Sequence, residues 1–250
     1  MRAEIPAIFV AGLSKRYRNV LAVDAISFSV ARGTIVGLLG GNGAGKTTTI
    51  AMIMGLVLPS GGAAQVLGTD MARDRHRILH RINFGSPYAE LPKRLTVRQN
   101  LRVFGALYNV RDIAARIDVL TAELDLAGFL DRPSGELSAG QKTRVALAKS
   151  LINTPDVIML DEPTASLDPD TADWVRSRLE RYRVDHRATI LLASHNMPEV
   201  ERLCNDVLMM KEGRIVDQGA PAELITRYGR ETMEDVFLDV ARGRNRETAR

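Results

Sequence analysis

Gly40-Gly41-Asn42-Gly43-Ala44-Gly45-Lys46-Thr47 contains two glycines five positions apart, followed directly by lysine and threonine, which is the pattern of a phosphate-binding loop. The apolar, β-branched run Thr34 to Leu39 precedes it, and the helix-forming run Lys46 to Gly55 follows it. A strand, a glycine-rich loop and a helix in this order are half of a parallel α/β unit. A glycine-rich turn without a ligand is the alternative, but it leaves the lysine and threonine unexplained.

The loop suits the phosphates of a nucleotide. Because glycine has no side chain, successive backbone N–H groups and the positive end of the following helix can converge on the β-phosphate. We expect Lys46 to contact the β- and γ-phosphates, Thr47 to ligate Mg²⁺ and Thr48 to add a phosphate contact. The residues predicted to contact ATP here are Gly40, Gly41, Asn42, Gly43, Ala44, Gly45, Lys46, Thr47 and Thr48.

Hydrophobic periodicity predicts the layers of the fold. Alternation from Ile8 to Val30 favours antiparallel strands with one buried face, and helical spacing without strand signals favours a helical insertion at 90–150. Strand-like runs return at Val157 to Leu160, Thr189 to Ala193 and Val207 to Met210. The predicted class is α/β, with a parallel sheet, an antiparallel β layer and a helical subdomain.

We predict one domain over residues 1–250. Its α/β core, with the N-terminal antiparallel layer, comprises 1–89 and 151–228, its helical subdomain 90–150, and its C-terminal helix and basic tail 229–250. The basic residues of the tail are Arg242, Arg244, Arg246 and Arg250. Chain ends fray, so a solvated tail is favoured over contact with lipid headgroups.

Two carboxylates, Asp161 and Glu162, follow the apolar run that starts at Val157. This places them at the C-terminal edge of a parallel sheet, where ligands bind. We expect Asp161 to hold Mg²⁺ through water, and Glu162 to accept a proton from, or orient, the water that attacks the γ-phosphate. Taken alone, the pair is better interpreted as a helix cap. Together with the phosphate loop it indicates hydrolysis.

Leu137-Ser138-Ala139-Gly140-Gln141 resembles the signature sequence of ATP-binding cassette (ABC) ATPases, and the apolar positions of Lys142 to Asn153 predict a helix after it. The serine hydroxyl, the glycine N–H groups and the helix end can bind an anion, whereas a helix cap explains the serine alone. The resemblance implies the ABC ATPase fold with its RecA-like core. It also implies that Ser138, Gly140 and Gln141 contact ATP held by a facing subunit.

The resemblance extends over nearly the whole chain. Tyr17 looks like the adenine-stacking aromatic residue of the family, Asp168 in Ser166-Leu167-Asp168 looks like its D-loop, and His195 is similar to its switch histidine. The catalytic residues so implied are Lys46, Glu162 and His195. The implied partners are a second ABC ATPase subunit, identical or related, and integral-membrane permease subunits, with no nucleic acid. ATP would favour the closed dimer, and hydrolysis would favour its reopening.

One segment departs from the family pattern. ABC ATPases normally carry a glutamine, linking the metal to the membrane partner, where this chain has Ser86 or Pro87. Ser86 could supply a shorter metal-ligating oxygen, and a structural turn is an equal alternative. Gln99 lies too far along, inside the helix expected from Thr96. Gly41 stands where the family often has proline, which changes the stiffness of the loop more than its chemistry.

The composition indicates where in the cell the protein is located and which classes of protein are disfavoured. The longest nearly unbroken apolar run, Ile50 to Leu58, is about half the length of a membrane-spanning helix, and the N-terminus lacks the apolar core of a signal peptide. The single cysteine, Cys204, suits a reducing compartment as a plain buried thiol. We therefore expect a cytoplasmic protein, bound to the inner face of the membrane through its permease. A net charge of +4 does not make the chain a polybasic binder.

The leading function is the ATPase of a transporter, with contact to the permease near Ser86 to Arg98. The segment Met233 to Leu238 resembles the end of exporter ATPases, although an amphipathic closing helix explains it equally well. A soluble ABC ATPase acting on nucleic acid, ribosomes or protein assembly is the alternative. A nucleotide-gated module with little turnover is disfavoured because Glu162 and His195 are present. A GTPase is disfavoured because no Asn-Lys-x-Asp motif occurs.

Overall fold

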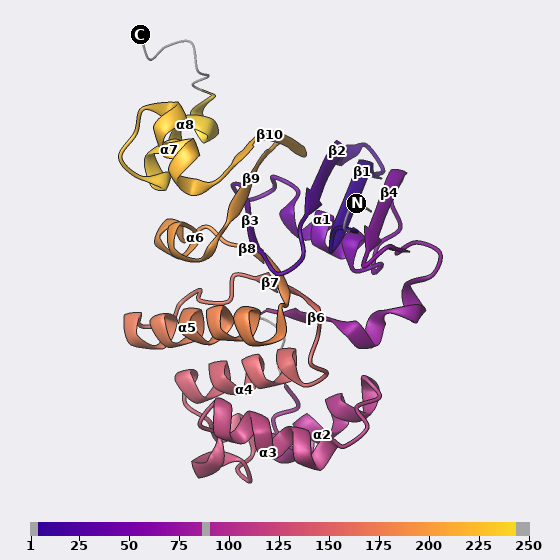
Figure 1. Cartoon of the computed structure of the whole chain (residues 1–250), viewed down its shortest axis with the longest axis vertical. Helices are drawn as coiled ribbons and strands as arrows, with labels where there is room; N and C mark the ends of the chain where they lie inside the picture. The colour runs from indigo at the N-terminus through magenta and orange to yellow at the C-terminus, as the bar shows by residue number, and fades with distance from the viewer. Residues whose placement is uncertain (1–4, 87–90, 244–250) are drawn as a thin grey trace. The chain divides into compact units, whose positions relative to one another are not determined.

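The computed structural model, drawn in Figure 1, describes residues 5–86 and 91–243. The chain forms two compact units. Unit 1 comprises Met1–Ile78 and Thr189–Arg250, and unit 2 comprises Leu79–Ala188. The segment 90–150, predicted to be a helical subdomain, falls inside unit 2. Pro87, Arg244, Arg246 and Arg250, which the sequence analysis considered, lie outside the described residues.

Unit 1 contains an antiparallel sheet of four strands in the order β2-β1-β4-β5. Its strands are β1 (Ile8–Tyr17), β2 (Val20–Val30), β4 (Gly61–Val66) and β5 (Thr69–Asp70). The first two strands pair from Ile8 opposite Val30 to Tyr17 opposite Val20, so the predicted antiparallel layer is confirmed. The sequence pattern did not predict β4, because its residues Gly-Gly-Ala-Ala have low strand propensity and its pairing with β1 decides its conformation.

A second set of strands in unit 1 lies in the order β10-β9-β3-β8. The strands are β3 (Ile35–Leu39), β8 (Thr189–Ala193), β9 (Asp206–Lys211) and β10 (Arg214–Gly219). Strand β3 is parallel to both β8 and β9, and β10 is antiparallel to β9. All five residues of β3 and of β8 are buried, as expected for strands covered on both faces. The parallel α/β core is therefore confirmed.

The helices of unit 1 follow these strands. They are α1 (Lys46–Ile53), α6 (Met197–Leu203), α7 (Pro221–Tyr228) and α8 (Met233–Arg242), with a 3₁₀ turn at Arg75–Arg77. The last three helices pack on one another. Glu201 in α6 accepts a 2.7 Å hydrogen bond from the backbone N–H of Met233, which anchors the start of α8.

Unit 2 contains the parallel pair β6 (Ile82–Gly85) and β7 (Val157–Asp161), surrounded by helices. The helices are α2 (Val97–Leu107), α3 (Ile113–Glu123), α4 (Ala139–Leu151) and α5 (Pro169–His186), with 3₁₀ turns at Leu79–Arg81, Ala127–Phe129 and Ser134–Glu136. In Figure 1, α4 lies between α5 and the α2–α3 pair. The helix α2 begins directly after its N-cap Thr96, close to the predicted start, and Thr96 and Gln99 form a reciprocal capping box.

Side chains of α4 and of the residues just after it form hydrogen bonds with strand β6 and the turn before it. The Lys149 ammonium donates to the carbonyl of Phe84 at 3.0 Å, and Asn153 donates to the carbonyls of His80 and Ile82. The buried Asn83 side chain donates back to Asn153 at 2.7 Å. Burial lowers the pKa of the Lys149 ammonium. The strand that leads to Ser86 is therefore fastened to the helix that follows the signature sequence.

Gly85 shows how closely β6 approaches α4. A Cβ atom built on Gly85 would lie 2.7 Å from Ser150 Oγ and 2.8 Å from Leu160 Cδ2. We expect Gly85→Ala to lower the free energy of unfolding by about 1–3 kcal/mol, because extra volume in a packed site forces neighbours to shift. Urea unfolding followed by circular dichroism measures this loss. Gly128→Ala is the control, since its added Cβ meets no atom within 4 Å; equal effects of the two changes would contradict the prediction.

Candidate nucleotide site

The phosphate loop connects the buried strand β3 to helix α1 in unit 1. Gly45, the N-cap of α1, has φ 104°, and a Cβ on it would lie 2.6 Å from the carbonyl oxygen of Ala22. Only glycine fits both this left-handed backbone and this close approach. The N–H of Ala44 donates to the Gly41 carbonyl at 3.1 Å and closes the loop.

The Lys46 ammonium lies over this loop. It donates to the carbonyl of Gly40 at 2.5 Å and to the carbonyl of Gly41 at 3.3 Å. The first turn of α1 contains no acidic residue, and the first N–H groups of a helix have no partner within the helix. A cation, helix-end N–H groups and a glycine backbone are the donor set that an oligophosphate requires. The residues present therefore fit ATP.

Strand register brings His195 to the same edge as the phosphate loop. Leu38 in β3 is paired with Ala193 in β8, and each strand ends within one residue of this pair. Gly40 and His195 therefore follow the C-terminal ends of neighbouring parallel strands, where ligands of α/β proteins bind. His195 is exposed, and Asn196 after it caps α6 by accepting from the N–H of Glu199.

A buried acid supports the turn that carries His195. Ser194 Oγ donates to Glu199 Oε2 at 2.6 Å, and Ser194 Oγ accepts from the N–H of Asn196 at 3.1 Å. Glu199 is fully buried. The sequence pattern did not predict this pair, although an acidic residue in the first turn after the apolar strand was a usable signal. We interpret Ser194 and Glu199 as residues that fix the backbone at His195.

Tyr17 ends β1 and leaves part of its ring accessible. The residue is 45% exposed, and the Lys15 ammonium lies 5.0 Å from the ring centroid. A cation over one face of a ring leaves the other face able to stack on a base.

In unit 2, strand register brings Ser86 beside the acidic strand end. Gly85 in β6 is paired with Leu160 in β7, so Ser86 and Asp161 follow paired residues on neighbouring strands. Glu162 has φ 55°, a left-handed conformation that a residue with a side chain adopts at a cost. The hydroxyl of Thr47 and the carboxylate of Asp161 are oxygen ligands of the kind Mg²⁺ prefers. Gln99, which lies in the capping box of α2, does not replace the missing glutamine.

The signature sequence forms the start of α4. Ser138 is the N-cap, its hydroxyl accepts from the N–H of Gln141 at 3.3 Å, and the Gln141 side chain accepts from the N–H of Ser138 at 3.0 Å. Ser138 is exposed. The capping interpretation is therefore correct for the serine, and its exposed hydroxyl can still accept or donate a further hydrogen bond.

Asp168 caps α5 in the same way as Ser138 caps α4. Its carboxylate accepts from the N–H of Thr171 at 3.0 Å, and hydrogen bonds from Thr171 lower the pKa of the Asp168 carboxyl. The first turns of the two helices are neighbours, because a Cβ on Gly140 would lie 3.5 Å from Thr171 Oγ1. Unit 2 therefore presents the signature residues and the D-loop residue side by side.

Outside these clusters, the predicted burial of the single cysteine is confirmed. Cys204 is buried, and burial raises the pKa of its thiol, so it is an unreactive core residue. Among residues 5–86 and 91–243, no helix combines the length and the apolar character that crossing a bilayer requires.

Known proteins share both the sequence and the fold. Residues 23–165 match the family described as ABC transporter. The Nod factor export ATP-binding protein I of Ralstonia nicotianae is 40% identical over 223 residues, which are 88% of this chain and 69% of that protein. The protein of the same name from a Rhizobium species is 38% identical over 224 residues, which are 89% of this chain and 73% of that protein.

Two solved structures extend the likeness. The ATP-binding subunit of an ABC transporter has a TM-score of 0.85 and 26% identity, with coverage of 94% of this chain and 99% of that chain. CbiO1 from Clostridium perfringens, part of an ABC transporter complex, has a TM-score of 0.80 and 30% identity, with coverage of 96% and 97%. The predicted family and fold class are confirmed. The chain belongs to the ABC transporter family and is an ATP-binding subunit that hydrolyses ATP for transport.

Proposed function

We propose that this chain powers export through a separate membrane permease by closing around ATP as a dimer. Strand register carries the proposal: the phosphate loop and His195 share one strand edge, and Ser86 and Asp161 share another. Side chains suited to phosphate, metal and water gather at such edges in enzymes that act on nucleotides. The two relatives described above are named as export proteins, which supports the direction.

Each residue has a distinct part in the proposed reaction. Lys46 and the loop N–H groups bind the phosphates, and Tyr17 stacks on the base. His195 contacts the γ-phosphate. Glu162 accepts the proton of the attacking water, or orients that water. Mg²⁺, when bound through Thr47, Asp161 and Ser86, neutralises phosphate charge.

The second half of each site comes from a facing subunit. Ser138, Gly140 and Gln141 bind the γ-phosphate held by the partner's loop, and Asp168 lies next to them at the start of α5. Contacts on both sides of the nucleotide exist only in the closed dimer, so ATP favours closure and phosphate loss favours opening. The proposed partner is a second copy or a related cassette.

We propose that the permease contacts the chain near Ser86 to Arg98, on the cytoplasmic side of the membrane. Purification of a tagged chain from solubilised membranes of its own cells tests this. We expect a protein with several apolar spans to co-purify and to remain bound at high salt. A chain that stays soluble and recovers RNA in a salt-sensitive way contradicts the proposal and supports the alternative function.

A further inference from the structure

The single tryptophan of the chain, Trp174, lies in α5 with two guanidinium groups near its ring. The Arg144 guanidinium, from α4, lies 4.6 Å from the ring centroid, and the Arg178 guanidinium, one turn along α5, lies 5.3 Å from it. Trp is the ring that attracts cations most strongly, and Arg can also stack its plane on the ring. The stack therefore joins α4 to α5.

A carboxylate brings both cations together. Asp125, just after α3, accepts from Arg144 at 3.1 Å and lies 3.7 Å from Arg178. The carboxylate reduces the repulsion between the two guanidinium groups, so both can stay against the ring. We call Asp125, Arg144, Trp174 and Arg178 the tryptophan staple.

The tryptophan staple lies further along the two helices that begin at the signature residue Ser138 and at Asp168. Arg144 and Trp174 each stand six residues after the cap of their helix, Ser138 and Asp168 respectively, or about 9 Å at 1.5 Å per residue. The first turns are neighbours at Gly140 and Thr171. Any tilt of α4 relative to α5 at the staple therefore changes the distance and orientation between the capping residues Ser138 and Asp168.

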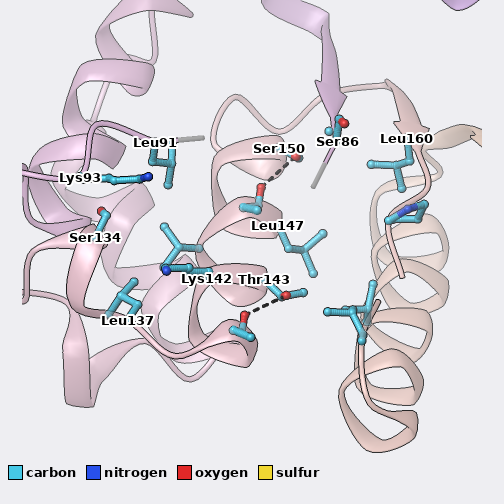
Figure 2. Close-up of a pocket in the computed structure, with 17 residues that line it drawn as sticks. Ser86, Leu91, Lys93, Ser134, Leu137, Lys142, Thr143, Leu147, Ser150 and Leu160 are labelled. Atoms are coloured by element: carbon cyan, nitrogen blue, oxygen red, sulfur yellow. Dashed lines mark hydrogen bonds between the residues drawn. The ribbon is translucent and has the colours of Figure 1, made fainter. Parts of the chain in front are cut away.

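A cavity lies beside the tryptophan staple, so the staple contributes more than packing does to the spacing of α4 and α5. A space of about 320 Å³ is lined by Ala139, Thr143 and Leu147 of α4 and by Leu167 and Val175 at α5. Figure 2 shows Thr143 and Leu147 directed into it. Side chains that line this pocket face open space instead of packed atoms, so they make fewer dispersion contacts there. The two helices are thus less constrained by packing here, and more by the staple.

We propose that Trp174 is a positioning residue for nucleotide closure: the staple keeps Ser138 and Asp168 at one spacing, so that both meet the facing subunit together. This rests on the proposed function, because it assumes that the two residues act on a nucleotide held by a partner. Trp174 itself does not contact the nucleotide in this proposal.

The test uses the Glu162→Gln chain, in which ATP-driven dimers should persist. Sedimentation velocity with ATP and Mg²⁺ gives the dimer dissociation constant, and titration with a fluorescent ATP analogue at low protein concentration gives the affinity of a single subunit. We expect Trp174→Leu to raise the dimer dissociation constant about tenfold, since the cation–π contacts with both guanidinium groups are lost. Affinity for the analogue should stay within twofold, because the phosphate loop lies in unit 1.

Two further variants separate positioning from folding. Trp174→Phe keeps an aromatic ring beside the cations and should recover most of the dimer affinity. Arg144→Lys should be intermediate, because it keeps the charge without the planar guanidinium group. Arg181→Met, at an exposed position of the same helix, is the matched control and should have no effect.

The outcomes distinguish this inference from the proposed function. If the Glu162→Gln parent forms no dimer with ATP, the proposed function itself is wrong. If the parent dimerises and Trp174→Leu dimerises equally well, Trp174 is not a positioning residue. A lower unfolding midpoint with an unchanged dimer constant also overturns the inference, because the residue then acts only in stability.

Discussion

Replacing Glu162 with Gln is expected to lower ATP turnover at least about a hundredfold, the low end for loss of a general base. Glutamine keeps the length and shape of the side chain but cannot accept the proton of the attacking water. The left-handed backbone at this position, φ 55°, strains glutamine and glutamate alike, so the change isolates the carboxylate. Because hydrolysis then stops before phosphate loss, the variant should accumulate as an ATP-bound dimer.

Phosphate release in saturating ATP and Mg²⁺ measures the turnover, and gel filtration in ATP detects the dimer. Glu234→Gln is the matched control, since Glu234 is an exposed glutamate at the start of α8 in the other unit and should leave both readouts unchanged. Turnover within threefold of the unchanged chain would remove Glu162 from the catalytic role assigned here.

Changing Ser138 to Asp should abolish ATP-driven dimerisation while each subunit still binds ATP. Aspartate is as good an N-cap as serine, and its charge also favours the start of a helix, so α4 should remain intact. In the closed dimer the new carboxylate would face the γ-phosphate, and like charges brought together at an interface cost several kcal/mol. We expect the dimer dissociation constant in the Glu162→Gln background to rise at least about a hundredfold.

Ser138→Asn is the matched control for charge. Asparagine has nearly the same shape and capping ability as aspartate but is neutral, so its effect on the dimer constant should be much smaller. Sedimentation in ATP compares the two variants. Equal dimerisation of Ser138→Asp and Ser138→Asn would show that Ser138 does not face a phosphate, and the proposed arrangement of two subunits would fail.

Much of the fold was predictable because its signals are local. The apolar run before the phosphate loop, the alternation from Ile8 to Val30 and the capping serine before α4 each depend on neighbouring residues. Strand β4 was missed because glycine and alanine carry little strand signal, and pairing with a distant strand decides its conformation. The roles of Glu199 and Trp174 were missed for a related reason. Their partners, Ser194 and Arg144, come into contact with them only after the helices and strands have packed.

The sequence by itself determined the chemistry: a loop for phosphates, a strand ending in two acids, and a serine–glycine signature at a helix start. These depend on short spacings along one chain, and backbone geometry turns such spacings directly into local structure. Only the tertiary structure decided which of these groups are neighbours. His195 reaches the edge of the phosphate loop through the pairing of β3 with β8, and Ser86 reaches Asp161 through the pairing of β6 with β7. Hydrogen bonds between distant strands select that order, and no local pattern contains it.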